Sequence, residues 1–209
     1  MDDTKNTEVN VMKKIVTLLL AAVMLLTLVA CGNGGKETTA NGEDTTASQA
    51  VESKDPLTVL QTVWASYGDD EKFAVAGGDM SEENSKMDEP GVFSLENKEE
   101  LDATLGLSAE AAEKVDSAAS LVHMMNANTF TCGAFHAKES GDVTALCSAL
   151  RENILARRWM CGFPEKLVIV TVGDYIVSVF GHADPVDTFT AKLAAAYPNA
   201  KTVSDDPIV

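Results

Sequence analysis

Cys31 has the clearest chemistry in this 209-residue chain, because it ends the stretch LVAC at residues 28–31. A basic start at Lys13-Lys14 and an apolar stretch over residues 15–28 precede it. A small residue and a cysteine behind such a leader are typical of a bacterial lipoprotein signal peptide, which is cleaved after lipid is attached to the thiol. The pattern predicts a signal peptide over residues 1–30 and a lipidated Cys31.

An uncleaved membrane anchor is the alternative, since residues 15–30 are only slightly shorter than a membrane span. The Gly-rich run at residues 32–35 favours the lipoprotein, because it opens a flexible tether where an anchor would carry flanking charge. Residues 1–11 are polar and acidic, unlike the basic start of a signal peptide. We therefore expect translation to begin at Met12.

His123, Cys132 and His136 form a second group that could do chemistry. Cys132 and His136 are four residues apart and so lie on one side of a strand, and His123 could approach them across a hairpin. Such a set could bind zinc or copper, or act as nucleophile and base. The spacing matches no established metal motif, and Phe130 and Ala134 share the face, so packing is the alternative. We assign no metal ligand, catalytic residue or cofactor, and keep the three as candidates only.

Three further thiols remain once Cys31 is lipidated, namely Cys132, Cys147 and Cys161. An odd number outside the cell leaves at least one unpaired, and the sequence does not decide whether two of them form a disulfide. We expect Cys132 and Cys147 to be buried thiols that behave as small hydrophobic groups. Cys161 lies in a predicted loop and is expected to be exposed.

Arg157-Arg158-Trp159 is the only basic cluster after the predicted signal peptide, in a chain whose net charge is −16. It could supply favourable charge at a helix C-terminus, or contact an anion or a partner. Removal of residues 1–30 leaves the net charge unchanged. Such an acidic chain excludes nucleic acid as a partner and disfavours adsorption to anionic lipid, so membrane attachment must be covalent.

Composition divides the mature chain into three parts. Residues 31–55 hold almost no large apolar residue and are expected to be a disordered tether, about 25–30 Å from end to end. Residues 56–198 are long enough for one domain with its own core, and residues 199–209 are expected to be a tail. Residues 69–102 contain 12 carboxylates, which predict a solvated face because they lack the order of a calcium loop.

Apolar spacing predicts an α+β domain in which helices pack on an antiparallel sheet, with strand-strand-helix order occurring twice in tandem. Asp55 and Pro56 suit the start of the first helix, and Asp184 and Pro185 the cap and first position of the last. Gly173-Asp174 predicts a type II′ hairpin. The predicted elements are helix 56–67, strand 73–76, helix 97–105, strands 118–125 and 129–137, helix 142–157, strands 167–172 and 175–180, and a helix that stops near Pro198.

The two strands of this hairpin are apolar on both faces, as a half-solvated sheet would not be. We expect the helices at 142–157 and 184–197 to lie on the same side, so the other face needs a cover. The helix at 56–67 is the expected cover, and a second chain is the alternative. His182, just before the last helix, is expected to be a loop histidine.

Several stretches of the chain carry a family resemblance: the lipobox and acidic tether, VD at 115–116 before LVHMM at 121–125, LREN at 150–153 before the turn at 159–164, and VGDYIV at 172–177. Together they are similar to an uncharacterised family of small clostridial lipoproteins with a domain of unknown function. The resemblance covers residues 56–197 and carries no site residues. It implies a Gram-positive cell-surface setting, with the lipid in the outer leaflet.

The sequence thus predicts a lipid-anchored protein at the outer face of the cell membrane, most simply a non-enzymatic module that binds a protein partner or a small ligand. The alternative is an extracytoplasmic metal-binding protein or enzyme that uses His123, Cys132 and His136. No catalytic signature such as a nucleophile elbow or phosphate loop is found in the sequence.

Lipidation should depend on Cys31 alone. In a Cys31→Ser variant the protein should leave the membrane fraction or accumulate as uncleaved precursor, because serine cannot form the thioether. Cell fractionation and immunoblotting measure both outcomes. Mature Cys31→Ser protein that still sediments fully with membranes would contradict the lipoprotein prediction.

Overall fold

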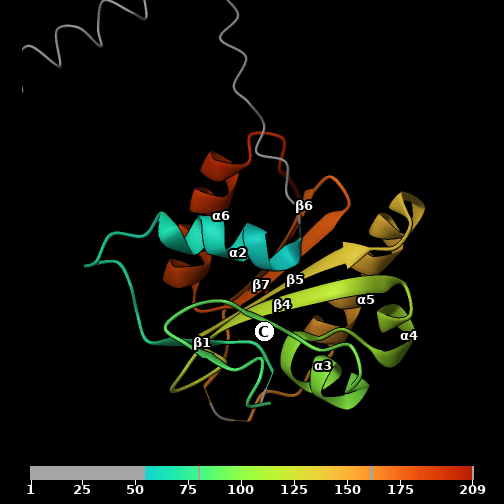
Figure 1. Ribbon diagram of the computed structural model, residues 1–209, viewed down its shortest axis with the longest axis horizontal. Helices are drawn as coiled ribbons and strands as arrows, with labels where there is room; N and C mark the ends of the chain where they lie inside the picture. Colours follow the sequence, from blue (N-terminus) through green and yellow to red (C-terminus); the bar gives the residue numbers. More distant parts are fainter. Residues whose placement is uncertain (1–54, 80, 161, 209) are drawn as a thin grey trace, which may run out of the picture. The chain divides into compact units, whose positions relative to one another are not determined.

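The structure is a computed structural model that describes residues 55–79, 81–160 and 162–208 (Figure 1). The predicted signal peptide, Cys31, the tether as far as residue 54, and Cys161 lie outside the described residues. The described part contains one antiparallel sheet of eight strands with five helices. The predicted α+β class is confirmed.

The sheet has the strand order β2-β1-β4-β5-β7-β6-β8, and β3 pairs with the same edge of β4 as β1 does. Every pairing between its strands is antiparallel. The strands are β1 (Val75–Gly77), β2 (Lys86–Met87), β3 (Gly91–Val92), β4 (Val115–His123), β5 (Phe130–Ala137), β6 (Lys166–Val172), β7 (Tyr175–Gly181) and β8 (Lys201–Pro207).

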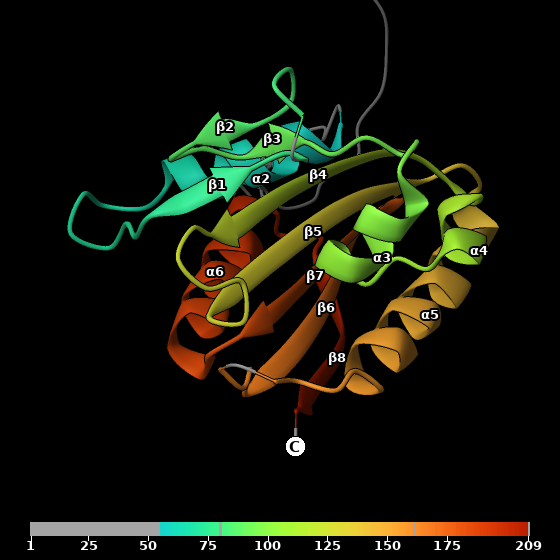
Figure 2. The ribbon, with the colours of Figure 1, turned by 90° about the horizontal axis from the view of Figure 1, so that it is seen from below.

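Helices cover both faces of the sheet (Figure 1 and Figure 2). On one face lie α2 (Pro56–Ala65) and α6 (Ala183–Ala196). On the other lie α3 (Lys98–Leu105), α4 (Ala109–Ala112) and α5 (Val143–Leu155), which follows a short 3-10 turn over residues 140–142. The domain therefore has three layers, with the sheet in the middle.

Along the central strands, successive side chains point to opposite faces of the sheet and belong to two separate cores. On β6, Val168, Val170 and Val172 face α2 and α6, while Leu167 and Ile169 face α5. The returning strand β7 repeats the pattern, with Val177 and Val179 on the first face and Ile176 and Phe180 on the second. The sequence prediction that both faces are apolar is confirmed.

The expectation that α5 and α6 lie on the same side is wrong, because they pack on opposite faces. The two helices lie on opposite faces because they follow strands that run in opposite directions. α5 joins β5 to β6 and α6 joins β7 to β8, and each connection steps over one intervening strand in the same direction across the sheet. The starting strands β5 and β7 are antiparallel. Since crossovers between parallel strands are almost always right-handed, two such steps from opposed strands place their helices on opposite faces.

The helix α2 packs beside α6 and completes the cover of that face, as expected from its apolar stripe. Asp55 caps it, since its Oδ1 accepts a hydrogen bond from the Thr58 N–H at 2.7 Å, and Pro56 occupies the first turn. The indole N–H of Trp64 donates to the Asp88 carbonyl at 2.9 Å. This bond ties the helix to the β2–β3 connection.

The predicted type II′ hairpin is confirmed by its backbone. Val172 pairs with Tyr175, so the turn has two residues, and Gly173 has a φ of +61°. Asp174 does not have a positive φ, which distinguishes type II′ from type I′. A side chain at residue 173 would be strained by that φ value.

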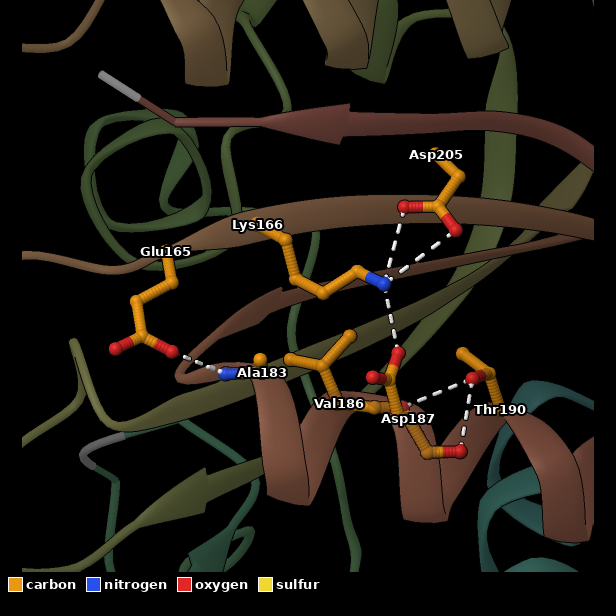
Figure 3. A network of polar contacts seen from close by, with 7 residues as sticks. All are labelled: Glu165, Lys166, Ala183, Val186, Asp187, Thr190 and Asp205. Atoms are coloured by element: carbon orange, nitrogen blue, oxygen red, sulfur yellow. Dashed lines mark hydrogen bonds and ion pairs between the residues drawn. The ribbon is translucent and has the colours of Figure 1, made fainter.

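The last helix begins earlier than predicted and is capped from elsewhere. It starts at Ala183, so Asp184 lies inside its first turn and is not the cap. The N-cap residue is His182, whose side chain makes no capping hydrogen bond, and the Glu165 Oε2 instead accepts from the Ala183 N–H at 2.7 Å (Figure 3). A carboxylate at a helix N-terminus also interacts favourably with the helix dipole.

The segment 199–209, expected to be a tail, contains the edge strand β8, which pairs with β6. Ion pairs hold β8 to both helical layers. The Lys166 ammonium lies 2.7 Å from Asp187 on α6 and 3.1 Å from Asp205 on β8 (Figure 3). Arg151 on α5 donates from Nε to Asp206 at 2.8 Å. Polar side chains on an edge strand discourage pairing with other chains. Because β8 is mostly polar, it shows no apolar alternation, and the sequence analysis did not predict it as a strand.

The acidic segment 69–102 is largely solvated as predicted, but Asp79 is buried. Burial alone would raise the pKa of Asp79, yet hydrogen bonds from Ser81, Asn84 and Ser94 outweigh it and lower the pKa to about 2. The Asn84 side chain donates at 2.8 Å and the Ser94 N–H at 2.9 Å. One carboxylate thus orders the connection that carries β2 and β3.

Replacement of Asp79 should destabilise the domain in a pH-dependent way. Asp79→Ala removes the buried acceptor of the half-buried Asn84 and Ser94 donors, which costs about 1–3 kcal/mol at neutral pH. Because the folded pKa is near 2 and the ordinary value is 3.8, the advantage of the wild type is present above pH 4 and is lost as the pH falls toward 2. Urea unfolding at pH 7 and pH 3 measures it, with exposed Glu82→Ala as the control. An equal loss at both pH values would contradict this role.

Candidate binding surface

The three side chains of the predicted thiol–imidazole group share one face of the sheet but do not meet. Cys132 is buried between the sheet and the α2–α6 layer and pairs in register with Leu121. His136 pairs with Ser117, six residues before His123 on the same strand. At about 3.3 Å per residue, the two histidines lie about 20 Å apart along β4. The shared face is as predicted, but a single centre built from all three is not possible.

His123 stabilises the turn that follows β4. Its Nδ1 accepts hydrogen bonds from the backbone N–H of Met125 at 3.2 Å and of Asn126 at 3.3 Å. The lone pair of Nδ1 is engaged by these two N–H groups and is therefore not available to a metal ion. The ring stacks on Phe73, with centroids 5.7 Å apart.

His136 has a carboxylate partner that the sequence did not indicate. Its Nδ1 lies 2.8 Å from Asp116 Oδ1, and its ring packs against Tyr175 at 4.7 Å. A bulge between Val115 and Ser117 in β4 interrupts the alternation at Asp116. Burial would raise the pKa of Asp116, but hydrogen bonds from His136 and Ser117 lower it. The Ser117 hydroxyl donates to Asp116 at 2.9 Å and not to the imidazole, so the group lacks the arrangement of an activated nucleophile.

The two described cysteines are free and buried, as predicted. Cys132 faces the α2–α6 core and Cys147 faces the α5 core, so the sheet separates them. Burial raises the pKa of Cys132, and it raises the pKa of Cys147 to about 11. Both thiols are therefore protonated and unreactive at neutral pH. Among the described residues, no group of three or more His, Cys, Asp or Glu side chains could hold a metal ion.

Two loops form a surface at the C-terminal end of β4, whereas His136 lies beside the N-terminal part of that strand. These are the β4–β5 turn at residues 124–129 and the α5–β6 connection at residues 156–165, which Figure 2 shows at the same end of the sheet. The Asn128 side chain donates to the Gly162 carbonyl at 2.8 Å. Gly162 has a φ of +70°, and a Cβ there would lie 2.6 Å from the Asn126 amide nitrogen. The two loops are therefore closely fitted to each other.

We call residues 124–128 with residues 158–160 and 162–163 the loop surface. It exposes four large apolar side chains, with Met125 at 81%, Met160 at 86% and Phe163 at 68%, and Met124 less so. Residues 123–131 and 156–164 contain no Asp or Glu, and their only charged residues are Arg157 and Arg158. A local concentration of exposed apolar side chains is characteristic of an interaction site.

Arg157 forms the base of this surface and belongs to the fold. Its guanidinium donates to the Asp102 carbonyl in the last turn of α3 and lies 5.8 Å from the ring centroids of Trp159 and Phe180. Burial lowers its pKa, and the Asp102 carboxylate opposes that shift. The sequence suggested favourable charge at a helix C-terminus, and the structure places the Arg157 guanidinium against a carbonyl in the last turn of α3.

Arg158 behaves differently from its neighbour. It is exposed and forms no ion pair within the described parts of the chain. Beside it lies a cavity of about 610 Å³ between α3 and the α5–β6 connection. Its wall includes Glu99, Asp102, Asn128, Arg157, Arg158 and Met160. Sequence reasoning missed the methionines here because it assigned Met124 and Met125 to the preceding strand, which ends at His123.

Comparisons of the chain with protein-family models, with curated proteins and with solved structures find no match. No helix in the described ranges is long and apolar enough to cross a membrane. The resemblance to clostridial lipoproteins remains a prediction.

The two adjacent arginines should differ in their effect on stability. Arg157→Ala removes a hydrogen bond and the packing over two rings, which should cost about 1–3 kcal/mol. Arg158→Ala should stay within about 0.5 kcal/mol of the wild type, as surface substitutions do. Urea unfolding of the two variants tests this directly, and equal losses would contradict the assignment of Arg157 to the fold and Arg158 to the surface.

Proposed function

We propose that this protein is a lipid-anchored, non-enzymatic binding module that holds a protein partner at the outer face of the cell membrane. The loop surface is its binding site. The observation that carries the proposal is the exposure of Met125, Met160 and Phe163 on two loops that are fixed to each other. Fixed loops present a preformed surface, so little ordering entropy opposes binding.

The anchor part of the proposal rests on the sequence. The lipobox ending at Cys31 and the polar segment 31–55 support a domain tethered to a bilayer. A binding role is favoured over a reactive one by the positions of the candidate residues. His123 closes a turn, Cys132 is enclosed in a core, and His136 is paired with Asp116.

The loop surface lies away from the start of the domain, where the tether would attach. Asp55 and Pro56 line a cavity with Asp116 and Ser117, at the end of β4 where His136 lies. The loop surface begins at the other end of β4, about 20 Å away at 3.3 Å per residue. The chain thus enters the domain at Asp55, at the end away from the loop surface, and leaves that surface open to a partner.

Photo-cross-linking in intact cells of the species that encodes the protein tests the proposal. Full-length protein with a photoreactive amino acid at position 125 or 160 should form a discrete adduct with another protein on irradiation. The same replacement at Val203, which is 50% exposed on β8, should not. The Cys31→Ser variant should give less adduct, because loss of the anchor lowers the effective concentration near a membrane-associated partner. Absence of a protein adduct at both loop positions would contradict the proposal.

A further inference from the structure

We infer that the loop surface recognises a protein segment that carries a carboxylate flanked by apolar side chains, with Arg158 binding the carboxylate. This inference rests on the proposed function and deepens it, because it specifies the chemistry of the partner. It follows from three observations: the charge of the loop surface, its apolar side chains, and the cavity beside Arg158.

The charge distribution favours an acidic partner segment at this surface. The chain has a net charge of −16, yet residues 123–131 and 156–164 contain two arginines and no carboxylate. The two loops themselves therefore offer positive charge and no competing carboxylate, and carboxylates of α3 lie close to them, where Glu99 and Asp102 line the cavity and Glu100 lines a pocket with Met124 and Met125. Like-charge repulsion elsewhere on the acidic chain adds to specificity, in addition to the attraction at the site.

Arg158 is the residue that can meet the carboxylate. The neighbouring Arg157 is half-buried and its guanidinium is already engaged with the Asp102 carbonyl. Arg158 is exposed, lines the cavity, and has no ion-pair partner in the described ranges. A guanidinium binds a carboxylate through two parallel hydrogen bonds, which fixes the orientation of the bound segment.

The apolar part of the partner would cover Met125, Met160 and Phe163. Methionine side chains are flexible and polarisable, so they adapt to apolar groups of different shape. Two of these three residues are methionines. The surface therefore requires apolar neighbours beside the carboxylate and leaves their identity loosely specified.

The cavity distinguishes a protein segment from a lipid surface. Its wall carries Glu99 and the Asp102 carboxylate as well as Arg158. A bilayer that covered Met160 would bring the Glu99 carboxylate, and the Asp102 carboxylate with its Asn153 partner, toward hydrocarbon, at a high desolvation cost. A side chain of a protein segment can enter the cavity and pair with its polar groups.

The test uses the full-length protein in its own cells, with the photoreactive residue at position 125 and the protein adduct as readout. Arg158→Glu should lower the adduct yield at least tenfold, because it puts a like charge opposite the partner carboxylate. Lys201→Glu makes the same charge change on exposed β8 and should leave the yield within twofold. Urea midpoints of both variants should match the wild type, which excludes unfolding as the cause.

A second pair of variants tests the apolar part. Met160→Ser should lower the adduct yield several-fold, while Val203→Ser, an equally polar change on β8, should not. Raising the salt concentration during irradiation should weaken the wild-type adduct, since the contact with Arg158 is exposed.

The outcomes separate the two proposals. A protein adduct whose yield is unchanged by Arg158→Glu overturns the acidic partner and leaves the binding module intact. No protein adduct at position 125 or 160 overturns both. Adducts formed only with lipid, identified by mass spectrometry, overturn both by showing that the surface contacts the bilayer.

Discussion

The central strands β5, β6 and β7 carry apolar side chains on both faces, so water must be excluded from two surfaces at once. This requirement sets the rest of the architecture. Two crossovers from antiparallel starting strands place α5 on one face and α6 on the other. Neither helix covers a face this wide alone. The helix α2 completes one layer, and the short helices α3 and α4 complete the second.

Once two layers enclose the sheet, the helix ends and the connections near its edges need polar partners. These come from residues distant in the chain. Glu165 caps α6, Arg157 satisfies a carbonyl in the last turn of α3, and Asp79 gathers the donors of the β2–β3 region. Asp79 is buried, Arg157 is half-buried and Glu165 is exposed, and each forms a hydrogen bond with a backbone group of a segment distant in the chain. The loops are ordered by such contacts, although they contribute little to either core.

The sequence was informative where side chains alternate and uninformative where contacts are distant. The strands around Gly173 and the stripe of α2 follow from periodicity, so their prediction succeeded. Sequence spacing also placed His123, Cys132 and His136 on one face, but it could not give their register, which sets two of them about 20 Å apart. The bulge at Asp116, the cap from Glu165 and the pairing of polar β8 all depend on residues brought together only by the fold.

The loop surface shows the same limit of prediction from sequence, here for the residues that are proposed to bind the partner. Arg157 and Arg158 are identical in type and adjacent in sequence, so no pattern separates them. In the structure the Arg157 guanidinium packs against the Trp159 ring and donates a hydrogen bond to a carbonyl of α3. Arg158 lies beside an open cavity. The first fixes the position of the loop, and that fixed loop is what gives the second a defined place relative to Met160. A binding role for Arg158 therefore depends on the structural role of Arg157, because an arginine on an unordered loop would lose the advantage of a preformed site.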